Sequence, residues 1–164
     1  MYWFISTKIY YTPKKTDMLE LALKIISEAF KGKLDKAGVP YVEHLFRVAD
    51  AVQAEYVKKG YSYTEELQCI ALLHDLLEDC HEWNEKSLSC LFNARVVAGV
   101  VALTHTSNLD YFSYISQVLE NGDAIRVKLC DLRDNMDVTR LKELTAKDFE
   151  RLNKYVKSYH RLLA

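Results

Sequence analysis

Residues that break helices are scarce in this chain. Its 164 residues include five Gly and two Pro, and 49% of them are hydrophobic. Turn-rich β folds need many such residues, so their scarcity favours helices joined by a few loops. The length suits one domain with one core and one active site. We therefore predict an all-α, single-domain helical bundle.

Apolar residues recur at helical spacing along most of the chain. Thr16 can cap the first helix, and Thr145 with Asp148 resembles a capping box at the start of the last one. Cap residues, Gly and Pro set the expected limits of the others. The predicted helices cover about residues 16–31, 41–56, 64–79, a short segment from 84, 94–103, 109–119, 123–136 and a final segment from 145.

The first fifteen residues differ from the rest. Residues 1–15 are aromatic and β-branched at their start, which is typical of a short strand or of an arm packed on the domain, residues 16–164. An arm of this kind could pack against a second subunit, so a homo-oligomer is one expectation.

The charge balance excludes several functions. A formal net charge of -1 and a pI near 6.5 provide no general attraction to nucleic acid or to an anionic membrane. The apolar opening, residues 1–11, is too short to span a bilayer and lacks the features of a signal peptide. We expect a cytoplasmic protein with a small-molecule substrate.

Polar residues gather on one face of the predicted helix 64–79. At about 100° per residue, His74, Asp75, Glu78 and Asp79 share a face opposite four leucines. Three carboxylates and an imidazole repel one another unless a cation or solvent compensates. A divalent metal would do so, and nitrogen and oxygen donors suit Mn, Fe, Zn or Co better than Ca. The alternative is an ordinary solvated face.

Three separated segments, in order, resemble the motifs of a known family. Residues 36–44 match K-x-G-x-P-Y-x-x-H, residues 71–79 match A-L-L-H-D-x-x-E-D, and residues 127–136 match K-L-x-D-x-x-x-N-M. The chain thus resembles the HD-domain superfamily, specifically the hydrolase domain of RelA/SpoT-type alarmone enzymes and their small single-domain relatives. The resemblance spans about residues 20–141.

This resemblance implies a helical HD-domain bundle holding one divalent metal ion, typically manganese. The implied ligands are His44, His74, Asp75 and Asp131. Glu78 and Asp79 would position and deprotonate the attacking water, the proton-accepting role that carboxylates serve beside a metal.

Substrate contacts are expected on both sides of the metal. Asn135 matches an asparagine that lines the nucleotide-phosphate pocket, and Lys36 is the lysine of the first motif. Lys128 and Arg47 are cations that could pair with phosphate, or else be solvated surface residues. The family commonly has a base-stacking arginine where this chain has Asp35, and an aspartate could instead accept hydrogen bonds from a base edge.

The expected reaction is hydrolysis of the 3′-pyrophosphate of (p)ppGpp or of a related nucleotide. One alternative is a nucleotidase or phosphatase acting on another nucleotide or nucleotide cofactor. Another is a non-catalytic nucleotide-sensing module, which would have no evident need for Glu78 and Asp79. We expect no synthetase activity, because the 164 residues suit one domain and leave no second one to carry it.

Overall fold

A computed structural model describes residues 17–164, so the predicted arm at residues 1–15 lies outside the described part. Its elements in chain order are α1 (Met18–Ala29), α2 (Val42–Lys58), α3 (Glu65–Leu73), α4 (Leu76–Asp79), α5 (Glu85–Ser89), α6 (Ala94–Leu103), α7 (Tyr111–Val118), α8 (Gly122–Met136), the 3-10 helix η1 (Val138–Arg140) and α9 (Ala146–Leu163). In residues 17–164 extended backbone pairs at one bridge, between Leu34 and Pro40. The all-α prediction is confirmed.

Side-chain caps explain where several helices begin. The side chains of Thr64, Asn93, Asp110 and Asn121 each accept hydrogen bonds from backbone N–H groups of the following first turn. Thr145 and Asp148 form the predicted reciprocal capping box. The predicted cap Thr16 lies outside the described residues. Asp17 is the N-cap of α1, and its carboxylate accepts a hydrogen bond from the N–H of Leu19.

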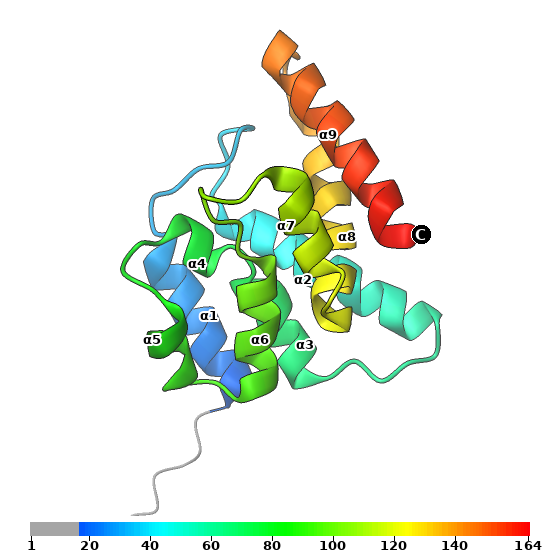
Figure 1. Cartoon of the computed structure of the whole chain (residues 1–164). Coiled ribbons are helices and arrows are strands. Elements are labelled where there is room, and N and C mark those ends of the chain that lie inside the picture. The colour runs from blue at the N-terminus through cyan, green and yellow to red at the C-terminus, as the bar shows by residue number, and fades with distance from the viewer. Residues whose placement is uncertain (1–16) are drawn as a thin grey trace, which may run out of the picture.

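Helix α3 lies at the centre of the bundle and packs against α1, α2, α6 and α8 (Figure 1). Its residues from Cys69 to Leu73 are all buried, so it is apolar around its whole circumference. His74 directly follows this buried segment of α3, so its imidazole lies in the interior of the protein.

The predicted helix 64–79 is interrupted at His74 and Asp75, which separate α3 from α4. Asp75 has φ −98° and ψ 0°, in the sparsely populated region between helix and strand where many active-site residues are found. The local sequence suits a helix throughout, so the interruption reflects the tertiary contacts of these two side chains. The prediction of one continuous helix over residues 64–79 is therefore wrong, although Asp75, Glu78 and Asp79 line the same cavity and His74 faces Asp75.

The backbones of α3 and α6 approach closely at Gly99. A Cβ atom at this position would lie 2.6 Å from the side chain of Ile70. Both residues are buried, and Ile70 cannot swing into solvent to make room. The absence of a side chain at Gly99 therefore sets how closely α6 packs on the helix that leads to His74.

We expect Gly99→Ala to lower the free energy of unfolding by about 2 kcal/mol, because close overlap with Ile70 costs about 3 kcal/mol and the helix-propensity gain returns only about 1 kcal/mol. Urea denaturation measures the change. Gly122→Ala is the matched control, since a Cβ there would approach only the flexible end of Arg126, at 3.4 Å. An unchanged or raised urea midpoint for Gly99→Ala would show that the contact between α3 and α6 has room for a methyl group.

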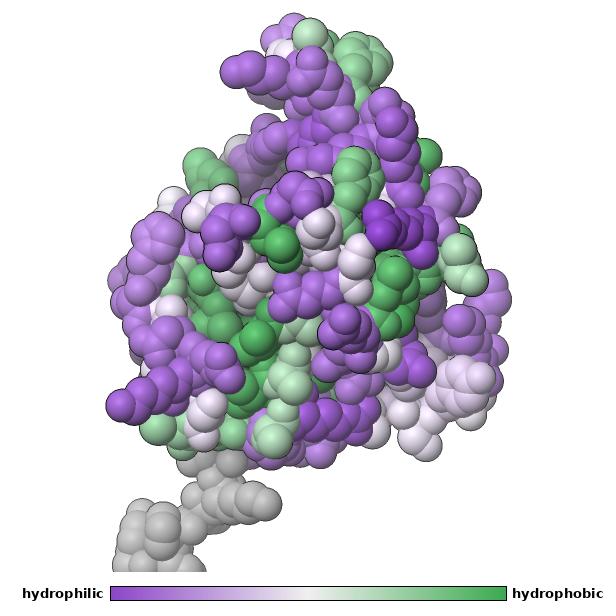
Figure 2. Space-filling view, viewed as in Figure 1, coloured by the Kyte–Doolittle hydropathy of each residue, from purple (hydrophilic) through white to green (hydrophobic). Residues whose placement is uncertain are grey.

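The surface is unevenly polar. In Figure 2 hydrophilic residues cover most of the region around α9, whereas hydrophobic residues are visible mainly over α6 and its neighbours. A shallow groove there is lined by Phe92, Ala94, Val97, Ala98, Val101 and Ala102, among others. Among the described helices, none combines the length and the apolar character that crossing a membrane requires.

Candidate metal centre

A cavity of about 300 Å³ lies beside the interruption between α3 and α4. Residues of α2, α4, α8 and α9 line it, together with the loop before α2. The predicted site residues that line it are Lys36, His44, Arg47, Asp75, Glu78, Asp79, Lys128, Asp131 and Asn135. His74 is 1% exposed and lies behind this wall. The fold thus brings together residues that are up to 99 positions apart in the sequence, from Lys36 to Asn135.

Two imidazoles and two carboxylates converge on one point. His44 Nε2 lies 3.2 Å from Asp131 Oδ1 and 3.5 Å from Asp75 Oδ2. His74 Nε2 lies 3.2 Å from Asp75 Oδ2 and 3.7 Å from Asp131 Oδ1. Donors about 2.1 Å from a metal ion would be separated by roughly 3.0–3.5 Å at adjacent coordination positions. The donor atoms of His44, His74 and Asp131 all lie within 4.8 Å of one another, as the ligands of one cation would be, and Asp75 adjoins both imidazoles.

The environment of His74 provides an independent test of this fit. Its Nδ1 is 2.7 Å from the carbonyl oxygen of Ala71 and donates a proton to it. Its Nε2 is buried and has no hydrogen-bond partner, although two carboxylate oxygens lie within 3.7 Å. A nitrogen lone pair that faces carboxylates is unfavourable unless a cation lies between them. The residues present therefore fit a divalent metal ion.

The pKa values of the two imidazoles reflect the same negative environment. Burial lowers the pKa of His74, but Asp75 and Asp131 more than offset this effect and raise it to about 9. Burial likewise lowers the pKa of His44, and hydrogen bonds to Asp131, Asp134 and Asp75 raise it to about 11. Despite burial, the pKa of Asp75 is held well below its usual range, chiefly by His74. In the absence of metal, protons supply the compensating positive charge.

We expect metal binding to release about one to two protons near pH 7.5, because both imidazoles must lose a proton to become ligands. Their pKa values of about 9 and 11 lie above this pH, so the metal-free imidazoles are protonated. The apparent metal affinity should consequently rise with pH between 6 and 8. Titration calorimetry in buffers of different ionisation enthalpy counts the protons, and a pH-independent affinity would contradict the proposed ligand set.

Glu78 lies on the cavity wall with one oxygen held in place. Its Oε2 accepts a hydrogen bond of 3.0 Å from the backbone N–H of His105. Burial raises the pKa of Glu78, and the nearby charge of Asp75 adds to the effect. Its carboxylate is thus oriented and more basic than an exposed glutamate, as proton transfer at neutral pH requires. This contact was not predicted from the sequence, because the His105 N–H lies just after α6 and outside the three motifs.

Asp79 faces a different partner from Glu78. Its Oδ2 forms an ion pair of 2.7 Å with Lys33 Nζ. That ammonium group also lies 4.5 Å from the centroid of the Tyr41 ring. Lys33 therefore fixes Asp79 at the edge of the cavity.

The predicted substrate contacts on α8 both touch Asp131. Lys128 Nζ lies 2.8 Å from Asp131 Oδ2, and Asn135 Nδ2 donates to Asp131 Oδ1 at 2.6 Å. Lys128 is largely buried, and the charge of Asp131 keeps its pKa well above the usual range despite that burial. Both residues therefore hold the Asp131 carboxylate in place as well as lining the cavity.

The other two predicted substrate contacts differ in their surroundings. Lys36 is exposed at the cavity rim, with its Nζ 3.9 Å from Asp148. Arg47 is bound to Asp134 through Nε at 2.6 Å and Nη2 at 3.1 Å, so two of its five N–H donors are already used and its orientation is fixed. Lys36 is thus the cation that is free to move toward an anion.

Asp35 also has partners within the protein. Its Oδ1 accepts hydrogen bonds from the N–H groups of Ala37 and Val39, at 2.8 and 3.1 Å. Its Oδ2 accepts from Arg140 Nη1 at 2.9 Å. These contacts stabilise the loop before α2. They also use the carboxylate oxygens that would otherwise accept hydrogen bonds from the edge of a base.

Several residues at the site were missed from the sequence. Tyr41 donates a hydrogen bond of 2.7 Å to Asp75 Oδ2, and Asp134 Oδ2 lies 2.6 Å from His44 Nδ1. Tyr41 lies inside the first motif, three residues before His44. Residues at this spacing are neighbours on a helix, so its place beside the site could have been predicted. Asp134 likewise follows Asp131 by three residues on α8.

Helix α9 contributes a further cation. Arg151 lines the cavity, and its Nε is buried without a hydrogen-bond partner. Its Nη1 lies 3.0 Å from Asp148 Oδ1 but without the geometry of a hydrogen bond. The hydroxyl of Tyr111 on α7 is also buried and unpartnered on the cavity wall. Hydrogen-bond donors of Arg151 and Tyr111 on this side of the cavity are therefore available to a ligand.

The fold and the cluster define a class: an all-helical protein in which two histidines and two aspartates form a site suited to a divalent cation. Among solved structures, the chain is similar to one described as a metazoan ortholog of SpoT that hydrolyzes ppGpp and plays a role in starvation responses. The TM-score is 0.71, with 21% sequence identity over 89% of this chain and 85% of that chain. No protein-family model matches the sequence, and no curated protein matches it. The fold expected from the RelA/SpoT resemblance is thereby confirmed.

Proposed function

We propose that this protein is a metal-dependent phosphohydrolase that removes the 3′-pyrophosphate of (p)ppGpp or of a closely related nucleotide. The observation that carries the proposal is the buried, unpartnered Nε2 of His74 facing two carboxylates at the wall of a cavity. Support also comes from the fold shared with a protein described as hydrolysing ppGpp. A cytoplasmic location remains a prediction from the sequence.

We propose His44, His74, Asp75 and Asp131 as the metal ligands. Their mixed nitrogen and oxygen donors, with coordination positions left for substrate and water, suit Mn²⁺. When bound, such an ion activates water and polarises a phosphoryl oxygen. Tyr41 and Asn135 would orient the two carboxylates through the hydrogen bonds that they donate to Asp75 and Asp131.

Glu78 is the proposed proton acceptor, and Asp79 is proposed to help position the attacking water. As the water oxygen bonds to the phosphorus, Glu78 takes its proton, and the bond from that phosphorus to the ribose 3′ oxygen breaks. The 3′ oxygen is then protonated, so the products are a nucleoside 5′-phosphate and pyrophosphate. The N–H of His105 would keep Glu78 pointing into the cavity throughout.

Cations around the cavity would neutralise the phosphates of the substrate. Lys36 is free at the rim, and Arg151 has unpartnered N–H groups on the α9 side. Lys128 is bound to Asp131, but a bound anion could share its other protons. Arg47 would act indirectly, through Asp134.

One observation favours a second candidate, a phosphatase or nucleotidase with another nucleotide as substrate. Asp35 is held by loop amides and Arg140, so it offers neither a stacking cation nor a free acceptor to guanine. A panel of ppGpp, pppGpp and nucleoside 2′- and 3′-monophosphates, assayed with Mn²⁺, separates the two candidates. Pyrophosphate released from ppGpp supports the first. Orthophosphate released from a monophosphate while ppGpp is untouched supports the second.

A further inference from the structure

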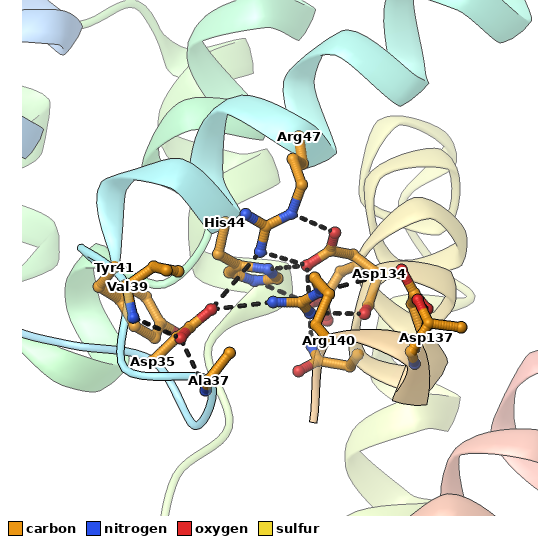
Figure 3. Close-up of polar contacts among 12 residues, drawn as sticks. Asp35, Ala37, Val39, Tyr41, His44, Arg47, Asp134, Asp137 and Arg140 are labelled. Carbon is orange, nitrogen blue, oxygen red and sulfur yellow. Dashed lines mark hydrogen bonds and ion pairs between the residues drawn. The ribbon is translucent and has the colours of Figure 1, made fainter. Parts of the chain in front are cut away.

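The strongest polar network outside the ligand set is centred on Asp134 at the end of α8 (Figure 3). Its Oδ2 lies 2.6 Å from His44 Nδ1. Arg47 donates to Oδ1 at 2.6 Å and to Oδ2 at 3.1 Å, and Arg140 donates to Oδ2 at 3.2 Å. The Asp134 side chain is only 12% exposed. Two guanidinium groups therefore hold this carboxylate in one orientation against the imidazole.

This contact determines which nitrogen of His44 is available to a metal. A carboxylate between two guanidinium groups stays ionised and can only accept hydrogen bonds. His44 Nδ1 must therefore carry a proton and donate it to Asp134. The remaining nitrogen, Nε2, is the one that faces Asp75 and Asp131. Asp134 thus selects the tautomer and the ring orientation that the cluster needs.

The two histidines of the cluster are held differently. His74 directly follows α3 and is held by the carbonyl oxygen of Ala71 in that helix. His44 sits on α2 and is fixed by a charged residue of α8, 90 positions away in the sequence. A carboxylate partner also makes the imidazole a more basic ligand than a carbonyl does. The strength of the site should therefore depend on Asp134 as well as on the four ligands.

The same carboxylate is connected to the loop before α2. Arg140 joins Asp134 to Asp35, and Asp35 in turn holds the N–H groups of Ala37 and Val39 (Figure 3). The formal charges of Asp134, Asp35, Arg47 and Arg140 cancel, and Asp137, 3.9 Å from Arg140 Nε, lies at the exposed edge of the network. These four residues can thus fix geometry at the centre without changing the net charge around the metal.

We propose that Asp134 is a positioning residue of the metal centre, which locks His44 in the tautomer that coordinates through Nε2. This inference rests on the proposed function, since it assumes the metal site. Asp134→Asn keeps the shape of the side chain but removes its charge. It also presents N–H donors to Arg47 and Arg140 in place of an acceptor.

The test is the affinity of the purified full chain for Mn²⁺, measured by titration calorimetry. We expect Asp134→Asn to bind about 10–100-fold more weakly than the wild type. Asp123→Asn is the matched control, because Asp123 forms a similar two-bond pair with Arg95 at the other end of α8. The control should lose the ion pair but keep the wild-type metal affinity.

A second measurement does not depend on the folding of a variant. In the Zn²⁺-loaded wild type, nitrogen NMR of labelled histidines should show His44 protonated at Nδ1 and coordinated at Nε2. Coordination through Nδ1, an unchanged affinity in Asp134→Asn, or an equal loss in Asp123→Asn would overturn the inference. Failure of the wild type to bind Mn²⁺ or Zn²⁺ would instead overturn the proposed metal site on which it rests.

Discussion

Replacing Asp75 with alanine is expected to abolish metal binding and turnover together. Asp75 Oδ2 is the oxygen that lies between the two imidazoles, 3.2 Å from His74 Nε2 and 3.5 Å from His44 Nε2. Its removal takes away one of four proposed ligands and the acceptor for the hydroxyl of Tyr41. Loss of a residue that merely supports a ligand costs about 10–100-fold in affinity, so loss of a ligand should cost at least about a hundredfold.

Calorimetry with Mn²⁺ and a phosphate-release assay measure the two effects of Asp75→Ala. Asp50→Ala is a suitable control, because Asp50 is an exposed carboxylate on the helix that carries His44. Circular dichroism should show that both variants retain their helices. Wild-type metal affinity in Asp75→Ala would mean that this carboxylate is not a ligand, whatever happens to turnover.

Replacing Glu78 with glutamine is expected to separate binding from catalysis. The amide keeps the size of the side chain and can still accept the hydrogen bond from the His105 N–H, but it cannot take a proton from water. General-base catalysis contributes about 10²–10⁴-fold, so turnover should fall by at least about a hundredfold at unchanged metal affinity. Because burial raises the pKa of Glu78, wild-type activity should also fall as the pH drops and Glu78 becomes protonated.

The measurements for Glu78→Gln are the turnover number at saturating Mn²⁺, its pH profile and the metal affinity. The fall in activity that Glu78 protonation causes should be missing from the residual activity of the variant. If Glu78→Gln lost metal as completely as Asp75→Ala, Glu78 would be a ligand or a structural support rather than the base.

The features best predicted from the sequence were the proposed metal ligands, which lie in motifs of fixed spacing, and the helices. His44, His74, Asp75 and Asp131 were selected by motif matching, and His74 and Asp75 also by the polar face of the predicted helix 64–79. The structure places both imidazoles within 3.7 Å of both carboxylates. The helices were also predictable, because their apolar spacing and cap residues are local properties of the chain. The roles assigned to these residues stay predictions until metal binding and turnover are measured.

The sequence was least informative where contacts between distant segments decide the outcome. Residues 64–79 have a helical pattern throughout, so nothing local predicted the interruption at His74 and Asp75. The partners of charged residues were equally hidden: Arg47 was expected to meet phosphate but binds Asp134, 87 positions away. Arg151 was missed because it lies outside the three motifs, and its place on the cavity wall depends on how α9 packs against the rest of the chain.

Metal-dependent hydrolysis of ppGpp, with Glu78 as the base, is tested most directly by following the products formed from ppGpp. Purified full chain, with Mn²⁺ added after removal of other metals, is incubated with ppGpp beside the Glu78→Gln variant, and the products are resolved by ion-exchange chromatography. We expect GDP and pyrophosphate from the wild type with Mn²⁺, and neither product without metal or, in the same time, from the variant. Equal cleavage by the variant, or activity that persists without any divalent metal, would contradict this mechanism.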